Sequence, residues 1–126
     1  MALVTLCDPR SMVDGDDWRT TAESFGAALA GARWRDAHAL LTAGLAADVA
    51  ADDLQTNYQH MCDYSDGLAS HVEVMETLRD WPGREKRDLG WAYVAIGGTN
   101  WSEAVALILA NEDGRSRIRA IEWGRP

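Results

Sequence analysis

The sequence has few of the residues that build disulfide frameworks, metal centres or nucleotide-binding loops. Its two cysteines, Cys7 and Cys62, form no CxxC pair. Isolated cysteines favour free thiols in a reducing compartment over a disulfide framework. The three histidines, His38, His60 and His71, form no HExxH motif, so we expect no metal site. The chain also has no P-loop and no GxSxG motif, and we expect no cofactor.

Long apolar runs and basic charge are also scarce. No apolar run reaches the roughly 18 residues of a membrane span, and the opening MALVTLC lacks the basic region of a secretory signal. We therefore expect a cytoplasmic protein that does not enter a membrane. The chain has 12 Lys and Arg residues and 20 Asp and Glu residues, which gives a net charge of −8. Phosphate backbones repel such a surface, which argues against nucleic-acid binding, whereas a basic protein partner would suit it.

The first half of the chain has helical periodicity. The length of 126 residues fits one domain, and we expect a loose segment over residues 1–13 and one domain over residues 14–126. Apolar residues spaced by three and four from Trp18 to Ala32 predict a first helix that ends at Gly31. A shorter helix is predicted from Trp34, followed by an interruption at Gly44.

A further helix is predicted over the segment DDLQTNYQHMCDY. Asp52 is its expected N-cap, with Gln55 three residues later as in a capping box. Cys62 falls near the end of this helix, and the segment YSDG follows it.

After Gly67 the pattern changes to alternation, which is typical of strands. The first strand, within ASHVEVMETLRDW, should place Val72, Val74 and Leu78 on one face. Its opposite face should carry the remaining alternate residues, which are His71, Glu73, Met75 and Thr77. Three more strands are predicted over LGWAYVAIG, EAVALILAN and SRIRAIEW. We expect an α+β fold, with N-terminal helices packed on a curled, four-stranded antiparallel meander.

Turn residues separate these strands. Pro82-Gly83 suits a type II turn, and Asp113-Gly114 is a strong hairpin signal. The segment GGTN lies between two strands, whereas a phosphate-binding glycine loop leads into a helix. We therefore expect GGTN to form a bend in which glycine supplies a positive φ.

The strand EAVALILAN is apolar on both alternating faces. Val105, Leu107 and Leu109 form one set, and small residues with Ile108 form the other. A strand with one wet face alternates apolar and polar residues, so both faces should be covered. We expect the helices to cover one face and a second copy of the chain to cover the other, giving a homodimer through the sheet face.

The order of elements resembles the nuclear transport factor 2-like superfamily, a cone-shaped, cystatin-like α+β fold. The local cues are WRDAHALL, DLQTNYQHM, WAYVAIGG and IRAIEWG, within residues 16–124. The resemblance implies a conical pocket and frequent dimerisation. It implies no single reaction, because the superfamily holds isomerases, dehydratases, cyclases, transport factors and small binding proteins.

The resemblance suggests where a pocket would lie. Tyr58, Tyr64, Trp91 and Tyr93 are the candidate ligand-pocket residues, and a small apolar ligand would suit them. Asp63, His71 and Tyr93 are the candidate catalytic residues, with Glu73 beside them, because superfamily enzymes use a carboxylate or histidine with a tyrosine. The alternative is that the tyrosines are core aromatics and Asp63 caps a turn.

Three functional hypotheses remain open at this stage. The leading one is a small-molecule-binding or protein-interaction module that forms a homodimer. The second is a cofactor-free isomerase, dehydratase or cyclase that works in the cone pocket. The third is an acidic, immunity-type protein that neutralises a basic partner.

Overall fold

The computed structural model describes residues 18–63 and 69–124. The expectation for residues 1–13, and any placement of Tyr64, lie outside these ranges. The helices are α3 (Trp18–Ala30), α4 (Trp34–His38), α5 (Ala43–Asp48) and α6 (Ala51–Met61). The strands are β1 (His71–Leu78), β2 (Asp88–Gly97), β3 (Ser102–Glu112) and β4 (Arg115–Trp123).

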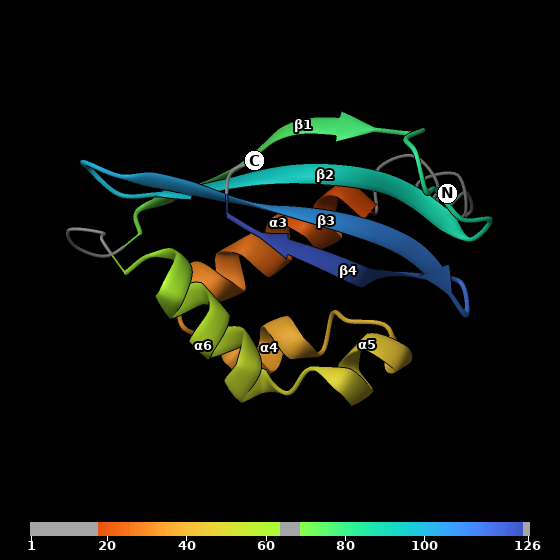
Figure 1. The fold of residues 1–126 in the computed structure, drawn as a ribbon, viewed down its shortest axis with the longest axis horizontal. Helices are drawn as coiled ribbons and strands as arrows, with labels where there is room; N and C mark the ends of the chain where they lie inside the picture. Colours follow the sequence, from red (N-terminus) through yellow and green to blue (C-terminus); the bar gives the residue numbers. More distant parts are fainter. Residues whose placement is uncertain (1–17, 64–68, 125–126) are drawn as a thin grey trace, which may run out of the picture.

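The four strands form one antiparallel sheet in the order β1-β2-β3-β4. The sheet is curled and open, and the helices lie against one of its faces (Figure 1). This arrangement confirms the α+β class and the meander that the alternation predicts. The other face carries no helix of the described part of the chain.

The core lies between α3 and the helix-facing side of the sheet. Trp18, Phe25, Leu29, Leu54 and Leu107 are all fully buried there. Burial of each such side chain contributes on the order of 2 kcal/mol.

Two glycines allow α3 to approach the sheet closely. A Cβ at Gly26 would lie 2.7 Å from a methyl carbon of Val72 on β1. A Cβ at Gly90 on β2 would lie 2.5 Å from a ring carbon of Trp18. Both positions therefore require glycine for space, because their φ angles are not positive.

The end of α3 differs in detail from the prediction. The helix ends at Ala30, and it is Ala32, not Gly31, that has a positive φ of 58°. The amide of Arg33 donates to the carbonyl of Ala28 (2.8 Å), and the amide of Ala32 donates to that of Leu29 (3.1 Å). This pair of bonds forms a Schellman motif, in which the left-handed position usually holds glycine.

The shorter helices also differ from the sequence expectations. Gly44 lies inside α5, where Thr42 is the N-cap and accepts a hydrogen bond from the Leu45 amide (3.2 Å). Helix α6 begins one residue before Asp52, so Asp52 is not its N-cap. Asp53 takes the capping role instead, by accepting a hydrogen bond from the Ala50 amide (2.9 Å).

The two turns between strands follow the predicted chemistry. Gly83 has a φ of 88°, and the Arg84 amide donates to the Trp81 carbonyl (3.1 Å), as a type II turn requires. Asp113 and Gly114 have φ angles of 55° and 82°, which fit the type I′ turn of a tight hairpin.

The GGTN bend joins β2 to β3 as expected, but for another reason. Gly97 and Gly98 do not have positive φ. A Cβ at Gly97 would lie 2.7 Å from the Trp101 carbonyl oxygen and 2.9 Å from the His71 ring. Glycine is therefore needed here for close packing, and the prediction about its backbone angle is wrong.

The alternation of β1 is broken by a β-bulge between Val74 and Glu76. After the bulge, Glu76 pairs with Tyr93 and Leu78 pairs with Trp91. The bulge moves Leu78 to the face opposite Val72 and Val74, so the prediction that these three share a face is wrong. A bulge adds one residue to one strand and thereby inverts the faces of the residues that follow it.

Candidate functional site

The side of the sheet against which none of the described helices packs, which we call the open face, carries side chains in rows across the strands. Leu78, Trp91, Ile108 and Ala120 align through the strand register and form the tryptophan row. Beside it, Glu76, Tyr93, Ala106 and Glu122 form the acidic row. Ala95 and Ala104 continue the face beyond the acidic row. The apolar second set on β3 that the sequence predicts therefore lies on the open face.

Aromatic side chains stand above a floor of small residues on this face. The rings of Trp91 and Tyr93 stack at 6.0 Å between centroids, with 16° between their planes. Beside them lies a groove of about 210 Å³, lined by Trp91, Ala106, Ile108, Ala120, Ile121 and Glu122. Leu78 is 37% exposed at its edge. The open face therefore combines an aromatic ridge with an apolar trough.

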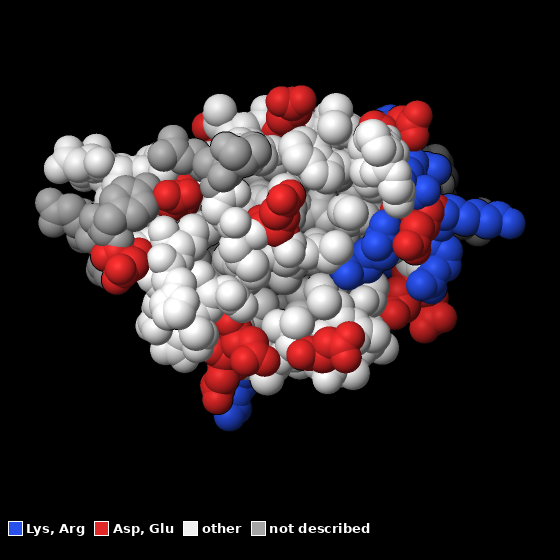
Figure 2. Space-filling model, in the orientation of Figure 1, with Lys and Arg blue, Asp and Glu red and all other residues white. Residues whose placement is uncertain are grey.

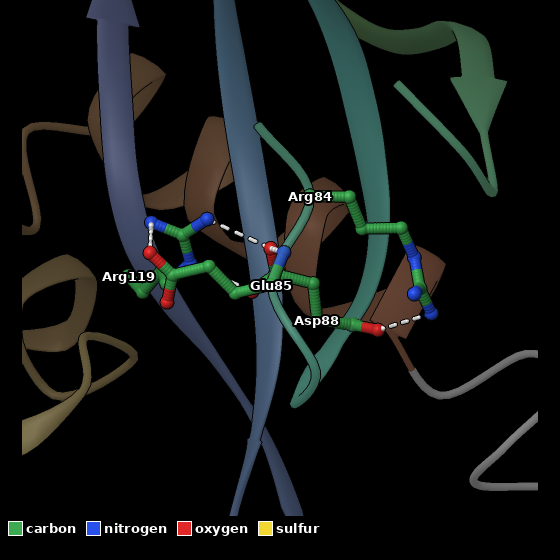
Figure 3. A network of polar contacts seen from close by, with 4 residues as sticks. All are labelled: Arg84, Glu85, Asp88 and Arg119. Carbon is green, nitrogen blue, oxygen red and sulfur yellow. Dashed lines mark hydrogen bonds and ion pairs between the residues drawn. The ribbon is translucent and has the colours of Figure 1, made fainter. Parts of the chain in front are cut away.

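An ion pair lies at one end of the open face (Figure 3). Arg119 on β4 reaches across β3 to Asp88 at the start of β2, with Nε 2.6 Å from Oδ1 and Nη2 2.7 Å from Oδ2. The Glu85 amide donates to Asp88 Oδ2 (2.8 Å), and the Arg84 guanidinium donates to the Asp88 carbonyl (3.0 Å). The loop between β1 and β2 is thereby fixed to the end of the sheet.

The environment of Asp88 favours its charged form. Its side chain is fully buried, and burial alone would raise its pKa. The hydrogen bonds from Arg119 and from the Glu85 amide, with the positive charges of Arg119 and Arg84, outweigh burial and lower the pKa of Asp88. The carboxylate is fully engaged by these partners, so it is a structural group that fixes the loop.

Charge is distributed unevenly over the open face (Figure 2). The centre is largely uncharged, with isolated carboxylates. Lys and Arg gather at the end of the sheet that carries the β3–β4 hairpin. Six of the 12 basic residues lie in two short segments at this end, at 84–87 and 115–119. This group, which we call the basic end, contrasts with the net charge of −8 for the whole chain.

The structure does not bring the candidate catalytic residues together. Asp63 is exposed just after α6, on the helical side of the molecule. His71 and Glu73 are exposed on β1, and His71 pairs with Gly97. Tyr93 lies four residues from Gly97, which is about 13 Å along a strand. His71 and Tyr93 therefore share a face of the sheet without contact, and Asp63 lies elsewhere.

The candidate pocket residues are divided between the two sides of the sheet. Trp91 and Tyr93 lie on the open face, whereas Tyr58 lies on α6 and packs against Trp34 at 5.6 Å between ring centroids. Burial and the neighbouring Cys62 raise the pKa of Tyr58, and burial raises the pKa of Cys62. Both shifts favour the protonated forms of these two groups.

Two further features bear on the kind of site. Among the described residues, no three His, Cys, Asp or Glu side chains are grouped so that they could hold a metal ion. Over the same ranges, no helix is both long and apolar enough to cross a membrane.

Sequence reasoning missed Asp88 and Arg119. The segments GREKRD and GRSRIR contain them, but their mixed charge is typical of solvated loops and strand faces. The signal that could have found them is an aspartate at the first position of a strand whose other residues are apolar.

The chain matches no known protein family, curated protein or solved structure.

Proposed function

We propose that this chain is a protein-interaction module that forms a homodimer through the open face of its sheet. The observation that carries the proposal is the tryptophan row, a band of apolar side chains across all four strands that no helix within residues 18–63 covers. Large contiguous apolar patches on soluble proteins mark interaction sites. Aromatic residues surrounded by polar ones are the usual anchors of such interfaces.

The nature of the face favours a second sheet over a small ligand. Two sheets pack face to face at about 10 Å when side chains of both inner faces interdigitate. The stacked rings of Trp91 and Tyr93 form the projecting surface, and the groove over Ala106 forms the receiving surface. A two-fold dimer uses the same patch on both copies, so a self-complementary patch suits it.

The groove also offers a place for a small apolar ligand, which is the second candidate. Ligand sites of drug-sized molecules are usually about 300 Å³ or larger and bury most of the ligand. The groove has about 210 Å³ and is only partly enclosed. It fits one side chain of a partner better than it fits an independent ligand.

The acid–base alternative receives no support from the arrangement. It needs a carboxylate or histidine within hydrogen-bond reach of a tyrosine. Asp63 and His71 are instead exposed on different parts of the molecule.

The test is a charge placed in the interface. Leu78→Glu introduces a carboxylate at an exposed position of the tryptophan row and should convert the dimer to a monomer, measured by light scattering after size exclusion. Gln59→Glu, on an exposed position of α6, adds the same charge outside the face and should leave the dimer intact. If both variants convert the dimer to a monomer, or if neither does, the open face is not the dimer interface.

A further inference from the structure

We infer that the two copies pack with opposite ends together, about a two-fold axis that crosses the strands at the tryptophan row, so that Glu122 of each copy pairs with the partner's Arg117. This inference rests on the proposed homodimer and specifies how its interface is built. The strand register fixes the position of each charge on the open face.

A two-fold axis between two stacked sheets can run along the strands or across them. An axis along the strands would exchange the sheet edges and keep the ends together. Glu76 of one copy would then lie over the partner's Glu122, and the two basic ends would meet. Like charges that face each other across an interface cost several kcal/mol. This orientation is therefore disfavoured.

An axis across the strands exchanges the ends of the sheet and separates the two basic ends. The remaining choice is the row on which the axis lies. If the axis lay on the acidic row, Glu76 would face the partner's Glu76 and Glu122 would face the partner's Glu122. On the tryptophan row, Trp91 and Ile108 meet apolar side chains of the partner, and Glu122 moves over the partner's row that contains Arg117. This position places the aromatic residue at the centre, where interface energy is concentrated.

The register then identifies a specific pair on β4. Ala120 belongs to the tryptophan row, Glu122 lies in the row before it, and Arg117 pairs with Ala110 in the row after it. Rotation about the tryptophan row therefore places the acidic row over the row that contains the partner's Arg117. The two symmetric Glu122–Arg117 pairs flank the apolar centre.

Both side chains are free to make this contact. Glu122 is exposed and Arg117 is half-buried. Within residues 18–63 and 69–124, neither of them forms an ion pair. The Arg117 guanidinium donates one hydrogen bond, to the Ser116 carbonyl (3.2 Å), and keeps further donors. Their partners on β3, Ala106 and Ala110, lie four residues or about 13 Å apart, so Glu122 and Arg117 do not pair within one copy.

The size of the face sets the expected affinity. Four strands about 4.8 Å apart and eight residues long at about 3.3 Å each span roughly 19 by 26 Å. The flat footprint of about 500 Å² per copy, or about 1,000 Å² in total, lies in the range of weak, transient interfaces, so we expect a weak dimer. Aligned sheets cross at about −30°, and the long side chains of Glu122 and Arg117 can follow that angle.

The test uses two charge-reversal variants, each carrying one of the two substitutions, measured alone and as a mixture. Glu122→Arg alone and Arg117→Glu alone each place like charges at both contacts. Each should weaken the homodimer roughly tenfold in dissociation constant. An equimolar mixture of the two variants restores both pairs, because each contact then joins an arginine to a glutamate. Sedimentation of the mixture should therefore show a heterodimer of nearly wild-type affinity.

Two charge reversals on the helical side of the molecule serve as controls. Glu23→Arg and Arg35→Glu, exposed on α3 and α4, change the net charge equally and should leave the dissociation constant unchanged. A wild-type dimer whose two single variants do not recover on mixing would overturn this orientation and leave the homodimer intact. A wild-type chain that stays monomeric would overturn the homodimer itself.

Discussion

At the scale of single residues, the Asp88–Arg119 pair is the strongest polar contact on the open face. Asp88 is fully buried, and both of its oxygens accept from Arg119. Asp88→Asn keeps the shape but removes the charge, leaving Arg119 without its partner. We expect a loss of about 3 kcal/mol in the free energy of unfolding at neutral pH. Urea unfolding measures this loss.

The matched control for Asp88 is Glu85→Gln. Glu85 lies 3.7 Å from Arg119, but its side chain is 66% exposed. Exposed ion pairs contribute little, so this variant should change stability by less than about 0.5 kcal/mol. Similar losses for both variants would show that burial does not distinguish the two carboxylates.

The lowered pKa of Asp88 also predicts a dependence of stability on pH. Its folded pKa lies below the unfolded carboxyl value near 4. The contribution of this group is therefore fully present above about pH 4 and is lost as the pH falls through the lower folded pKa. The stability difference between wild type and Asp88→Asn should shrink at acid pH. A difference that stays constant between about pH 2 and pH 7 would contradict this account.

Gly90 allows Trp18 to pack directly on the backbone of β2. Gly90→Ala would place a Cβ 2.5 Å from the indole ring, and we expect a loss of about 1–3 kcal/mol from overpacking. Gly44→Ala is the control, because a Cβ there meets no atom within 4 Å in the helix α5. It should stabilise the protein by roughly 0.5 kcal/mol. Thermal unfolding of the two variants should therefore shift in opposite directions.

At the scale of elements, the end of α3 holds alanine where glycine is favoured. Ala32 has a φ of 58°, a conformation that costs a residue with a Cβ roughly 1 kcal/mol. Ala32→Gly should raise the free energy of unfolding by about 0.5–1 kcal/mol. Ala30→Gly, two residues earlier and still helical, should lower it by a similar amount. If both variants lower the free energy of unfolding, Ala32 does not have the left-handed conformation described for the end of α3.

The elements that the sequence predicts well are those with strong local signals. Helix α3, the four strands and the turns at Pro82-Gly83 and Asp113-Gly114 follow from spacing and turn chemistry. The bulge in β1 has no such signal, because it depends on pairing with β2. The face that Leu78 occupies could therefore not be predicted from alternation alone.

The candidate site was predictable only in part, for a similar reason. The doubly apolar β3 predicts from sequence that both faces of the sheet are covered, and the alternation of β2 places Trp91 and Tyr93 on one face, but neither pattern indicates which face the helices occupy. Sequence alone does not assign a helix residue to one side of a sheet, so it does not separate Tyr58 from Trp91 and Tyr93. Asp88 was missed because its partner Arg119 lies 31 residues away in the chain.

At the scale of the whole molecule, a dimer that dissociates on unfolding links stability to protein concentration. Only the folded chain presents the open face, so mass action favours the folded state as concentration rises. The melting temperature of the wild type should increase with protein concentration. That of Leu78→Glu should not change. A melting temperature independent of concentration in the wild type would indicate that no folded dimer contributes.

The homodimer is the central claim, and sedimentation equilibrium of the wild-type chain tests it most directly. We expect a species of twice the 13.8 kDa chain mass at concentrations of tens of micromolar and above, in equilibrium with monomer at lower concentration. A single species at the chain mass throughout this range would contradict the assignment of the open face as an interface between two copies.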